Sequence, residues 1–282
     1  MVQVSNSENK PTKVLSHKPY GSIAHLSMSK LGEGDYHIEL FQERMMLDPD
    51  SKPEKFRLMF FLQEKLDGSN CSVVNWNGEL VALTRSGYRC TDSKMEMHQM
   101  FARYVKEKEE EFKKLLPVHE NRCTGEWLAL AHGIHYKKDD LDDPYVIFDW
   151  FEKEHSKINA LQLMEKMKDI KLKLIDSYIY FTPKTFAELE EYMHNIMSCN
   201  LRDERWEGFV LRTEKLPPRI HKLIVSEGLN AYLEDVKKLA EPWMIVKYVK
   251  QSHPTGSYLK QEIPVYNEIA QELLFKKEDN NA

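Results

Sequence analysis

The sequence predicts an α+β fold of largely antiparallel sheets flanked by helices. Short segments rich in β-branched and aromatic residues predict strands. Helical patterns lie between them without the regular strand-helix-strand alternation of a parallel sheet. Asn77-Gly78, between two such segments, is a strong signal for an antiparallel hairpin. The predicted strands are at residues 57–64, 70–76, 79–84, 125–131, 145–151, 208–213 and 243–249.

The sequence predicts one main domain with a short segment on either side. Residues 1–18 are polar and carry proline breakers, which predicts a loose N-terminal arm. The domain itself is expected at residues 19–250, and a short helical extension at residues 251–282. The predicted helices are at residues 92–116, 156–170, 185–199 and 229–240, with a last amphipathic segment at 265–277.

Composition excludes several classes of protein. The 282 residues are enough for a hydrophobic core without disulfides. A formal net charge of -5 gives no global positive field, so any polyanion site must be a local patch. The four cysteines form no CxxC pair, which disfavours a disulfide framework or a zinc knuckle and favours a reducing, cytoplasmic setting. No apolar run predicts a membrane span or a signal peptide.

Lys65 is the first candidate for chemistry, because it ends an apolar strand in the turn Lys65-Leu66-Asp67-Gly68. A lysine attacks only as the free amine, and at its usual pKa of about 10.4 roughly one in a thousand is free near neutrality. Burial and neighbouring cations must therefore lower the pKa of a catalytic Lys65. Asp67 is placed to orient the amine, and Gly68 lets a phosphate approach. Alone, this pattern fits an exposed turn lysine beside a hairpin better than a catalytic one.

The turn is the first of a series of short motifs in a fixed order. Over about residues 20–250 they resemble the covalent nucleotidyltransferases, the superfamily of ATP-dependent RNA and DNA ligases and mRNA capping enzymes. The segments at residues 20–26 and 125–136 resemble the RNA-ligase branch most. The resemblance implies a nucleotidyltransferase (ligase adenylation) domain at residues 19–250. The later motifs are Thr84-Arg85-Ser86-Gly87, Gly125-Glu126-Trp127, Val146-Ile147-Phe148-Asp149, Trp206-Glu207-Gly208-Phe209-Val210 and Ile245-Val246-Lys247.

The resemblance implies two lysines at the reacting phosphate. The family lysine that matches Lys65 attacks the α-phosphate of ATP and forms a covalent lysyl-AMP. The one that matches Lys247 touches this phosphate and helps to keep the nucleophile uncharged. The family motif has two lysines separated by one residue, whereas this chain reads Val246-Lys247-Tyr248-Val249-Lys250. One family lysine is missing or displaced, and Lys250 is expected on the opposite face of the strand.

The resemblance also implies an adenylate pocket and a metal ligand. Glu64 belongs to the part of the family pocket that reads adenine, and Arg85 and Glu126 match residues that hold the ribose hydroxyls. Phe148 matches the aromatic that stacks on adenine, although a core strand residue is the alternative. Glu207 matches the carboxylate that engages Mg²⁺ (or Mn²⁺), through water.

Two weaker candidates remain. His132 and His135 in an aromatic loop raise the alternative of a zinc site, but without a third fixed ligand a structural or substrate-facing role is favoured. A cluster of basic residues is a candidate patch for backbone phosphates, with a mixed charged loop as the alternative. This cluster comprises Arg202, Arg205, Arg212, Arg219, His221 and Lys222.

The expected function is an ATP-dependent RNA ligase of RNA repair. It would seal 5′-phosphate and 3′-hydroxyl ends of RNA through lysyl-AMP and an adenylylated 5′ end. Only 35 residues follow Lys247, too few for the five-stranded OB-fold typical of DNA ligases and capping enzymes. This disfavours a capping enzyme and leaves a minimal ATP-dependent DNA ligase as the alternative. A non-catalytic nucleic-acid-binding module is the other, because a fold alone does not fix function.

Overall fold

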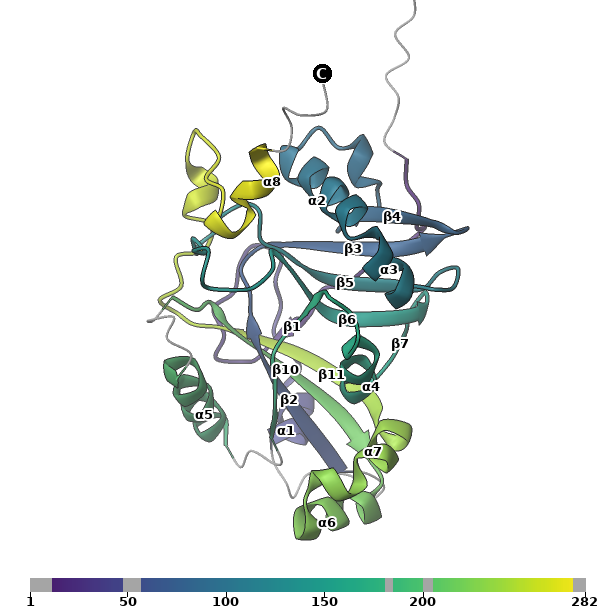
Figure 1. Cartoon of the computed structure of the whole chain (residues 1–282). Helices are drawn as coiled ribbons and strands as arrows, with labels where there is room; N and C mark the ends of the chain where they lie inside the picture. Colours follow the sequence, from purple (N-terminus) through teal and green to yellow (C-terminus); the bar gives the residue numbers. More distant parts are fainter. Residues whose placement is uncertain (1–11, 48–56, 181–184, 200–204, 276–282) are drawn as a thin grey trace, which may run out of the picture.

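Two sheets form the body of the computed structural model, which describes residues 12–47, 57–180, 185–199 and 205–275 (Figure 1). Neighbouring strands are antiparallel except for two parallel pairs, β1 with β11 and β6 with β8. The first sheet has the order β1 (Ala24–His25), β11 (Glu241–Val249), β10 (Gly208–Leu216), β2 (Arg57–Lys65) and β9 (Ser177–Tyr180). The second has the order β4 (Glu79–Thr84), β3 (Ser69–Trp76), β5 (Arg122–Trp127), β6 (Tyr145–Lys153) and β7 (Ser156–Lys157), with β8 (Lys173–Leu174) beside β6.

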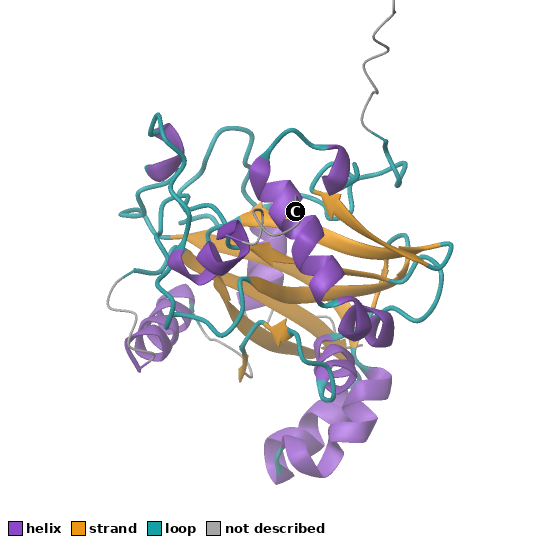
Figure 2. Ribbon diagram, turned by 45° about the horizontal axis from the view of Figure 1, so that its top comes forward, coloured by secondary structure: helices purple, strands orange, loops and turns teal. Residues whose placement is uncertain are grey.

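Helices surround the two sheets, and Figure 2 shows them on the outside of the strands. This arrangement confirms the predicted α+β class of antiparallel sheets flanked by helices. The α-helices are α1 (Leu40–Leu47), α2 (Glu96–Glu107), α3 (Glu109–Leu115), α4 (Ala160–Met167), α5 (Phe186–Cys199), α6 (Pro218–Glu227), α7 (Leu233–Leu239) and α8 (Gln271–Phe275). Short 3₁₀ helices occur at Cys90–Asp92, Leu229–Tyr232, Tyr258–Lys260 and Glu268–Ala270. No described helix is long and apolar enough to span a bilayer.

The first sheet is buried on both faces, which explains why β2 reads as a continuous apolar run. On one face Phe60 and Leu62 pack with Leu189 of α5. On the other, Met59 and Phe61 pack against residues of α4, α6 and α7. β2 is therefore a central strand, and Lys65 at its end is carried by a rigid element.

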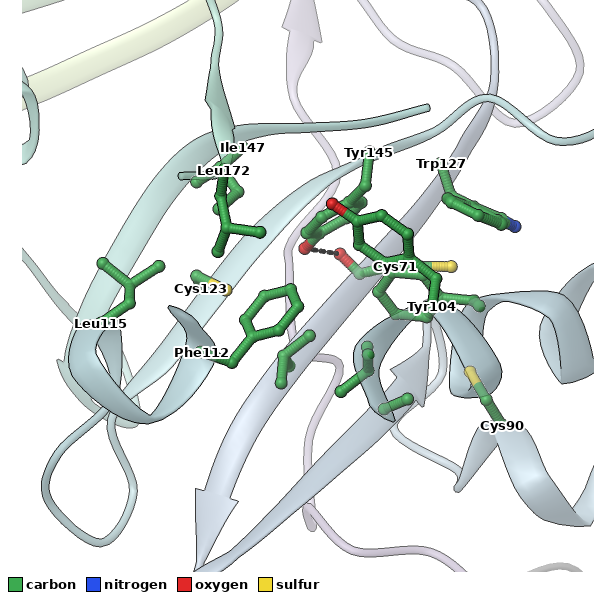
Figure 3. Packing of buried hydrophobic residues seen from close by; sticks show 14 of the residues in the cluster. Cys71, Cys90, Tyr104, Phe112, Leu115, Cys123, Trp127, Tyr145, Ile147 and Leu172 are labelled. Atoms are coloured by element: carbon green, nitrogen blue, oxygen red, sulfur yellow. Dashed lines mark hydrogen bonds between the residues drawn. The ribbon is translucent and has the colours of Figure 1, made fainter. Parts of the chain in front are cut away.

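The second sheet packs one face against α2 and α3. Tyr104 and Phe112 from these helices meet Trp127 and Tyr145 from the sheet (Figure 3). The Tyr145 hydroxyl donates a hydrogen bond of 3.1 Å to the carbonyl of Cys71. This aromatic core fixes β5 and β6, which carry Glu126 and Phe148.

Most predicted strands are confirmed, but the one at 125–131 is misplaced. The strand begins at Arg122 and ends at Trp127. Its first half was missed because Arg122 and Thr124 are polar yet buried. Residues 128–131 leave the sheet and pair with the C-terminal segment, where Ala131 N–H donates to the carbonyl of Val265. The strands β1, β7, β8 and β9 have two to four residues, too short for a periodic pattern.

The predicted helices are confirmed in part. The helix at 92–116 divides at Lys108, which lies between α2 and α3. The helix at 156–170 begins only at Ala160, because Asn159 and Gln162 form a capping box there. The segments at 229–240 and 265–277 each begin with a 3₁₀ turn, and residues 276 and 277 lie outside the described residues. The sequence reading missed α1 and α6, although Pro218 at the start of α6 is a typical helix-start signal.

The two segments that flank the predicted main domain both pack against the part of the protein that contains the second sheet. Residues 1–11 of the predicted arm lie outside the described residues. In its described part, Val14 N–H donates to the carbonyl of Gly87, and Leu15 is buried. Beyond residue 250, Asn267 N–H donates to the carbonyl of Ala129, and Leu273 joins the core of the second sheet. The boundaries at residues 18 and 250 stay predictions.

A buried polar cluster joins the two sheets. Arg212 of β10 pairs with Asp149 of β6 at 2.8 Å, and the Tyr20 hydroxyl donates to Asp149 at 2.7 Å. Glu214 lies farther along β10, and its Oε1 accepts a 2.5 Å hydrogen bond from Ala160 N–H. Burial raises the pKa of Glu214 from 4.5 to about 7.

Glu214 predicts a pH-dependent change in stability. The folded protein keeps a proton on Glu214 up to about pH 7, whereas the unfolded chain releases it near pH 4.5. This carboxyl therefore destabilises the fold progressively between these values. Glu214→Gln keeps the acceptor for Ala160 and removes the titration. We expect the melting temperature of Glu214→Gln, relative to wild type, to rise from about pH 5 to about pH 8. A difference independent of pH contradicts this assignment.

Candidate functional site

A pocket of about 230 Å³ lies between the sheets, and six of the predicted site residues line it. Its walls come from the ends of β2 and β11 in one sheet and from β5 and β6 in the other. Residues 20–23 contribute a further wall. The predicted residues that line it are Glu64, Lys65, Arg85, Glu126, Phe148 and Lys247. The fold thus brings together motifs that are far apart in the sequence.

Lys65 forms an ion pair with Glu207. The distance between Nζ of Lys65 and Oε2 of Glu207 is 2.5 Å. The two residues meet because Gly208 pairs with Lys65 on β2 and with Val249 on β11. A Cβ at Gly208 would lie 1.8 Å from the carbonyl oxygen of Tyr248, so only glycine fits this close approach. Burial lowers the pKa of Lys65, but Glu207, together with Glu126 and Asp67, outweighs this effect and holds the pKa above its usual value.

A catalytic Lys65 was expected to have a lowered pKa. With Glu207 as its partner, Lys65 has a raised pKa instead. The amine of Lys65 is protonated while Glu207 is its partner. A nucleophilic amine requires that this pair separates and that the proton leaves.

Glu126 lies across the pocket on β5. Its Oε1 accepts a 3.2 Å hydrogen bond from Gly68 N–H. A Cβ at Gly68 would lie 2.7 Å from the carbonyl oxygen of Trp127, so the turn after Lys65 can approach β5 only as glycine. Burial raises the pKa of Glu126 to about 8, so near pH 7 this carboxyl is mostly protonated. In that form it both donates and accepts hydrogen bonds.

Phe148 and Arg85 form other parts of the pocket wall. The Phe148 ring is half-buried and lies edge-on to Tyr20, with ring centroids 5.1 Å apart. Arg212 donates a 2.9 Å hydrogen bond to the carbonyl of Phe148, which ties this position to the ion pair between the sheets. Arg85 follows β4, and its exposed side chain lies at the edge of the pocket. Glu64 is buried at the end of β2.

Asp67 does not make the contact with Lys65 that the sequence suggested. Its Oδ2 accepts hydrogen bonds from Gly133 N–H at 2.6 Å and Ile134 N–H at 3.0 Å. Burial raises the pKa of Asp67, but its contacts with His253 and the Gly133 N–H hold it below its ordinary value. Asp67 therefore anchors the loop at residues 133–134 and acts on Lys65 through its charge.

Asp67, Glu207 and His253 form a candidate metal site. Their ligand atoms all lie within 4.8 Å of one another. His253 is only 1% exposed, and neither of its ring nitrogens forms a hydrogen bond with the residues that the structure describes. Two carboxylates fit Mg²⁺ or Mn²⁺, and the imidazole favours Mn²⁺ over Mg²⁺. Glu207 was the predicted ligand, whereas His253 carried no sequence signal because it lies in a loop outside the motifs.

Lys247 is held by Asp35, which in turn contacts His25, and neither residue had a predicted role. Nζ of Lys247 lies 2.9 Å from Oδ1 of Asp35, and Oδ2 of Asp35 lies 3.1 Å from Nε2 of His25. Burial raises the pKa of Asp35, but the hydrogen bond and charge of Lys247 hold it at about 2. His25 pairs with Lys247 across β1 and β11. Asp35 therefore fixes the lysine amine from the pocket's outer side.

The remaining candidates separate in space. Lys250 lies beyond the end of β11 and does not line this pocket; its Nζ is 4.8 Å from the centre of the Trp206 ring. His132 Nδ1 lies 3.9 Å from Oδ1 of Asp67, whereas His135 Nε2 lies 3.2 Å from the carbonyl of Tyr266. The two histidines thus have different partners, so a shared zinc site is not supported.

The predicted basic patch is not one surface. Arg212 is buried between the sheets, and Arg202 lies outside the described residues. Arg205 lies just before β10, whereas the other basic residues are on α6, just after it. A strand as long as β10 spans about 30 Å, so the two groups are at opposite ends of it (Figure 1).

The candidate metal site predicts that loss of the His253 imidazole weakens the binding of Mn²⁺ more than that of Mg²⁺. His253→Gln removes the imidazole ligand, and we expect Mn²⁺ binding, measured by isothermal titration, to weaken about ten- to a hundred-fold. Mg²⁺ binding should change less, because Mg²⁺ prefers oxygen ligands. His135→Gln, outside the cluster, is the control and should bind Mn²⁺ as the wild type does. Unchanged Mn²⁺ affinity in His253→Gln would exclude the imidazole from the site.

Comparisons with known proteins identify the family. A family model described as RNA ligase matches residues 59–224, more than half of the chain. No curated protein is significantly similar to this chain. Similar solved structures include an archaeal ATP-dependent RNA ligase, form 2 (TM-score 0.46, 16% identity, 82% of this chain and 48% of the other). An RNA ligase from Naegleria gruberi with PPi has a TM-score of 0.43 and 14% identity over 82% of this chain and 63% of its own.

A putative ATP-dependent DNA ligase from Aquifex aeolicus has a TM-score of 0.39 and 15% identity over 78% of this chain and 63% of its own. The chain thus spans about half to two thirds of the length of these proteins. The family match covers the motif of Lys65 and those of Glu126, Phe148 and Glu207. On this match, the chain belongs to the RNA ligase family.

Proposed function

We propose that this protein is an ATP-dependent RNA ligase that seals 5′-phosphate and 3′-hydroxyl ends through a lysyl-AMP intermediate. One observation carries the proposal. In a chain of the RNA ligase family, the amine of Lys65 lies in the same pocket as Glu126, Phe148 and Lys247, which come from both sheets. A role in RNA repair follows from the sealing of such ends.

The nucleotide would be bound by side chains rather than by a glycine-rich loop. Phe148 offers an aromatic face for adenine, and Glu64 lines the same pocket. Arg85 and Glu126 supply a donor fork and a carboxyl for the ribose hydroxyls. This arrangement directs the α-phosphate toward Lys65 and Lys247.

In the first step, Nζ of Lys65 would bond to the α-phosphorus while the bond to pyrophosphate breaks. Lys65 must first lose its proton to water, and the positive charge of Lys247 disfavours a second cation nearby. The same charge stabilises the negative charge that develops on the phosphate. A divalent cation held by Glu207, Asp67 and His253 would supply further charge neutralisation at the phosphates.

Two more transfers complete the reaction. An oxygen of the 5′-phosphate takes the AMP from Lys65 and forms the adenylylated end. The 3′-hydroxyl then attacks that 5′-phosphate, and AMP leaves. The chain's part in all three steps is positioning and charge stabilisation, the main source of catalysis in phosphoryl transfer. We assign these steps to a domain at residues 19–250, with residues 251–282 as an extension.

Two other functions are weaker. A minimal ATP-dependent DNA ligase would use the same pocket and the same lysyl-AMP. A non-catalytic nucleic-acid-binding module needs neither the pair of Lys65 with Glu207 nor the contact of Lys247 with Asp35. These ionisable contacts around one pocket therefore favour the enzyme.

The nucleophile is tested by labelling. With α-labelled ATP and a divalent cation, we expect label on the protein and none on Lys65→Ala. Lys65→Arg should also stay unlabelled, because a guanidinium does not give up its proton. Lys94→Ala, an exposed lysine outside the pocket, is the control and should label as the wild type does. Undiminished label on Lys65→Ala would show that another group is the nucleophile.

Asp35 is expected to support adenylation by holding Lys247. Asp35→Asn removes the charge that fixes the lysine amine, and a small misplacement at the reacting phosphate costs up to about a hundred-fold in rate. We expect single-turnover labelling of Lys65 to slow roughly ten- to a hundred-fold, with smaller changes in ATP affinity. Glu33→Gln, an exposed residue in the same loop, is the control. Equal rates for both variants would remove Asp35 from the site.

Substrate choice separates the two ligase candidates. A protein distinguishes RNA from DNA at one position through the 2′-hydroxyl. We expect fast sealing of nicks whose 3′-terminal nucleotides are ribonucleotides and much slower sealing when they are deoxynucleotides. The sugar on the 5′-phosphate side should matter less. Equal rates on all-DNA nicks and RNA-ended nicks would favour the minimal DNA ligase and leave the lysyl-AMP chemistry unchanged.

A further inference from the structure

A second pocket, of about 500 Å³, lies next to the Lys65–Glu207 pair and shares no lining residue with the first. Trp206 in its wall directly precedes Glu207. Gly133, also in its wall, donates its N–H to Asp67. His253 connects it to the candidate metal site. A ligand in this second pocket would thus lie beside the reacting group but outside the space for ATP.

The second pocket combines aromatic faces with positive charges. Trp206 and Tyr258 provide the rings, and Lys137, Arg205 and Lys250 the cations. This combination is the chemistry of single-stranded nucleic-acid sites, where bases stack on rings and cations face the phosphates. One cation–π contact is present in this pocket, because the amine of Lys250 lies over the ring of Trp206.

Hydrogen bonds fix the walls of the second pocket. Tyr258 N–H donates to the carbonyl of His132 at 2.8 Å. Both guanidinium NH₂ groups of Arg205 bond to Asp140, each at 3.1 Å. Lys30 donates a 2.5 Å hydrogen bond to the carbonyl of His253. These bonds fix the backbone at Tyr258 and His253 and the side chain of Arg205, so part of the wall is in place before a ligand arrives, which lowers the entropic cost of binding.

We propose that the second pocket binds the terminal nucleotide of an RNA strand at the break, with its base against Tyr258 and Trp206 and its phosphate near Lys137 and Lys250. The proposal rests on the proposed function, because a ligase must hold a strand end beside Lys65. The nucleotide can come from the 5′-phosphate strand or from the 3′-hydroxyl strand, and both offer the same base and phosphate chemistry.

The chain offers matched pairs of variants for the test. Tyr258→Ala removes a lining ring, whereas Leu259→Ala changes its exposed neighbour, which lies outside the lining. Lys137→Ala removes a lining cation, whereas Lys138→Ala changes the adjacent exposed lysine. Labelling of Lys65 by α-labelled ATP should be unchanged in all four variants. That result would show that the fold and the first pocket are intact.

Binding of two fluorescent single-stranded RNAs is then measured by anisotropy, one with a free 5′-phosphate and one with a free 3′-hydroxyl. Tyr258→Ala should weaken binding of one of them about five- to a hundred-fold, the range for a lost base stack. The loss should vanish when the terminal nucleotide is abasic. Lys137→Ala should weaken binding whatever the base and reduce the salt slope by about 0.7.

The strand whose affinity falls identifies the end that the second pocket holds. If Tyr258→Ala and Lys137→Ala bind both RNAs as tightly as Leu259→Ala and Lys138→Ala, the proposal is overturned. A loss with Tyr258→Ala that persists on the abasic RNA would overturn the stacking geometry. Absence of label on the wild type would refute the proposed ligase function, whereas the anisotropy results would still decide on the RNA site.

Discussion

The buried ion pair between Arg212 and Asp149 holds the two sheets together. Their side chains are 2% and 0% exposed, and Tyr20 bonds to the same carboxylate. Loss of one partner of such a pair leaves an uncompensated buried charge and typically costs about 3–5 kcal/mol. The pocket proposed for the nucleotide lies between the sheets that this pair joins. The width of this pocket therefore depends on the Arg212–Asp149 ion pair, which takes no part in the proposed reaction.

The site forms where the chain passes from one sheet to the other. β2 and β3 are consecutive strands, yet they belong to different sheets, and Lys65 begins the short turn between them. Gly68 allows this turn to lie against β5, and Gly208 brings Glu207 to the lysine. Both glycines permit close backbone contact that any side chain would prevent. The position of Lys65 is thus a consequence of how the two sheets join.

The charges around Lys65 favour its protonated form, whereas the proposed reaction needs the neutral amine. Glu207 stabilises the ammonium directly, and Lys247 is turned toward Asp35. A cation that competes with Lys65 for Glu207 shifts the balance toward the free amine, whereas the contact with Asp35 keeps Lys247 in position. The Lys65–Glu207 contact would therefore change when ATP and a cation bind.

The sequence by itself determined the strands that carry the motifs, because apolar runs rich in aromatic and β-branched residues mark buried strands such as β2 and β6. The resemblance of its motifs to a known family also implied six of the residues that line the pocket. Only the tertiary structure decided which side chains contact one another in the site. Asp35 and Lys247 are 212 residues apart, and His253 reaches Asp67 from a loop without a motif. Arg212 read as a surface cation, but packing buried it, because burial depends on neighbours that are distant in sequence.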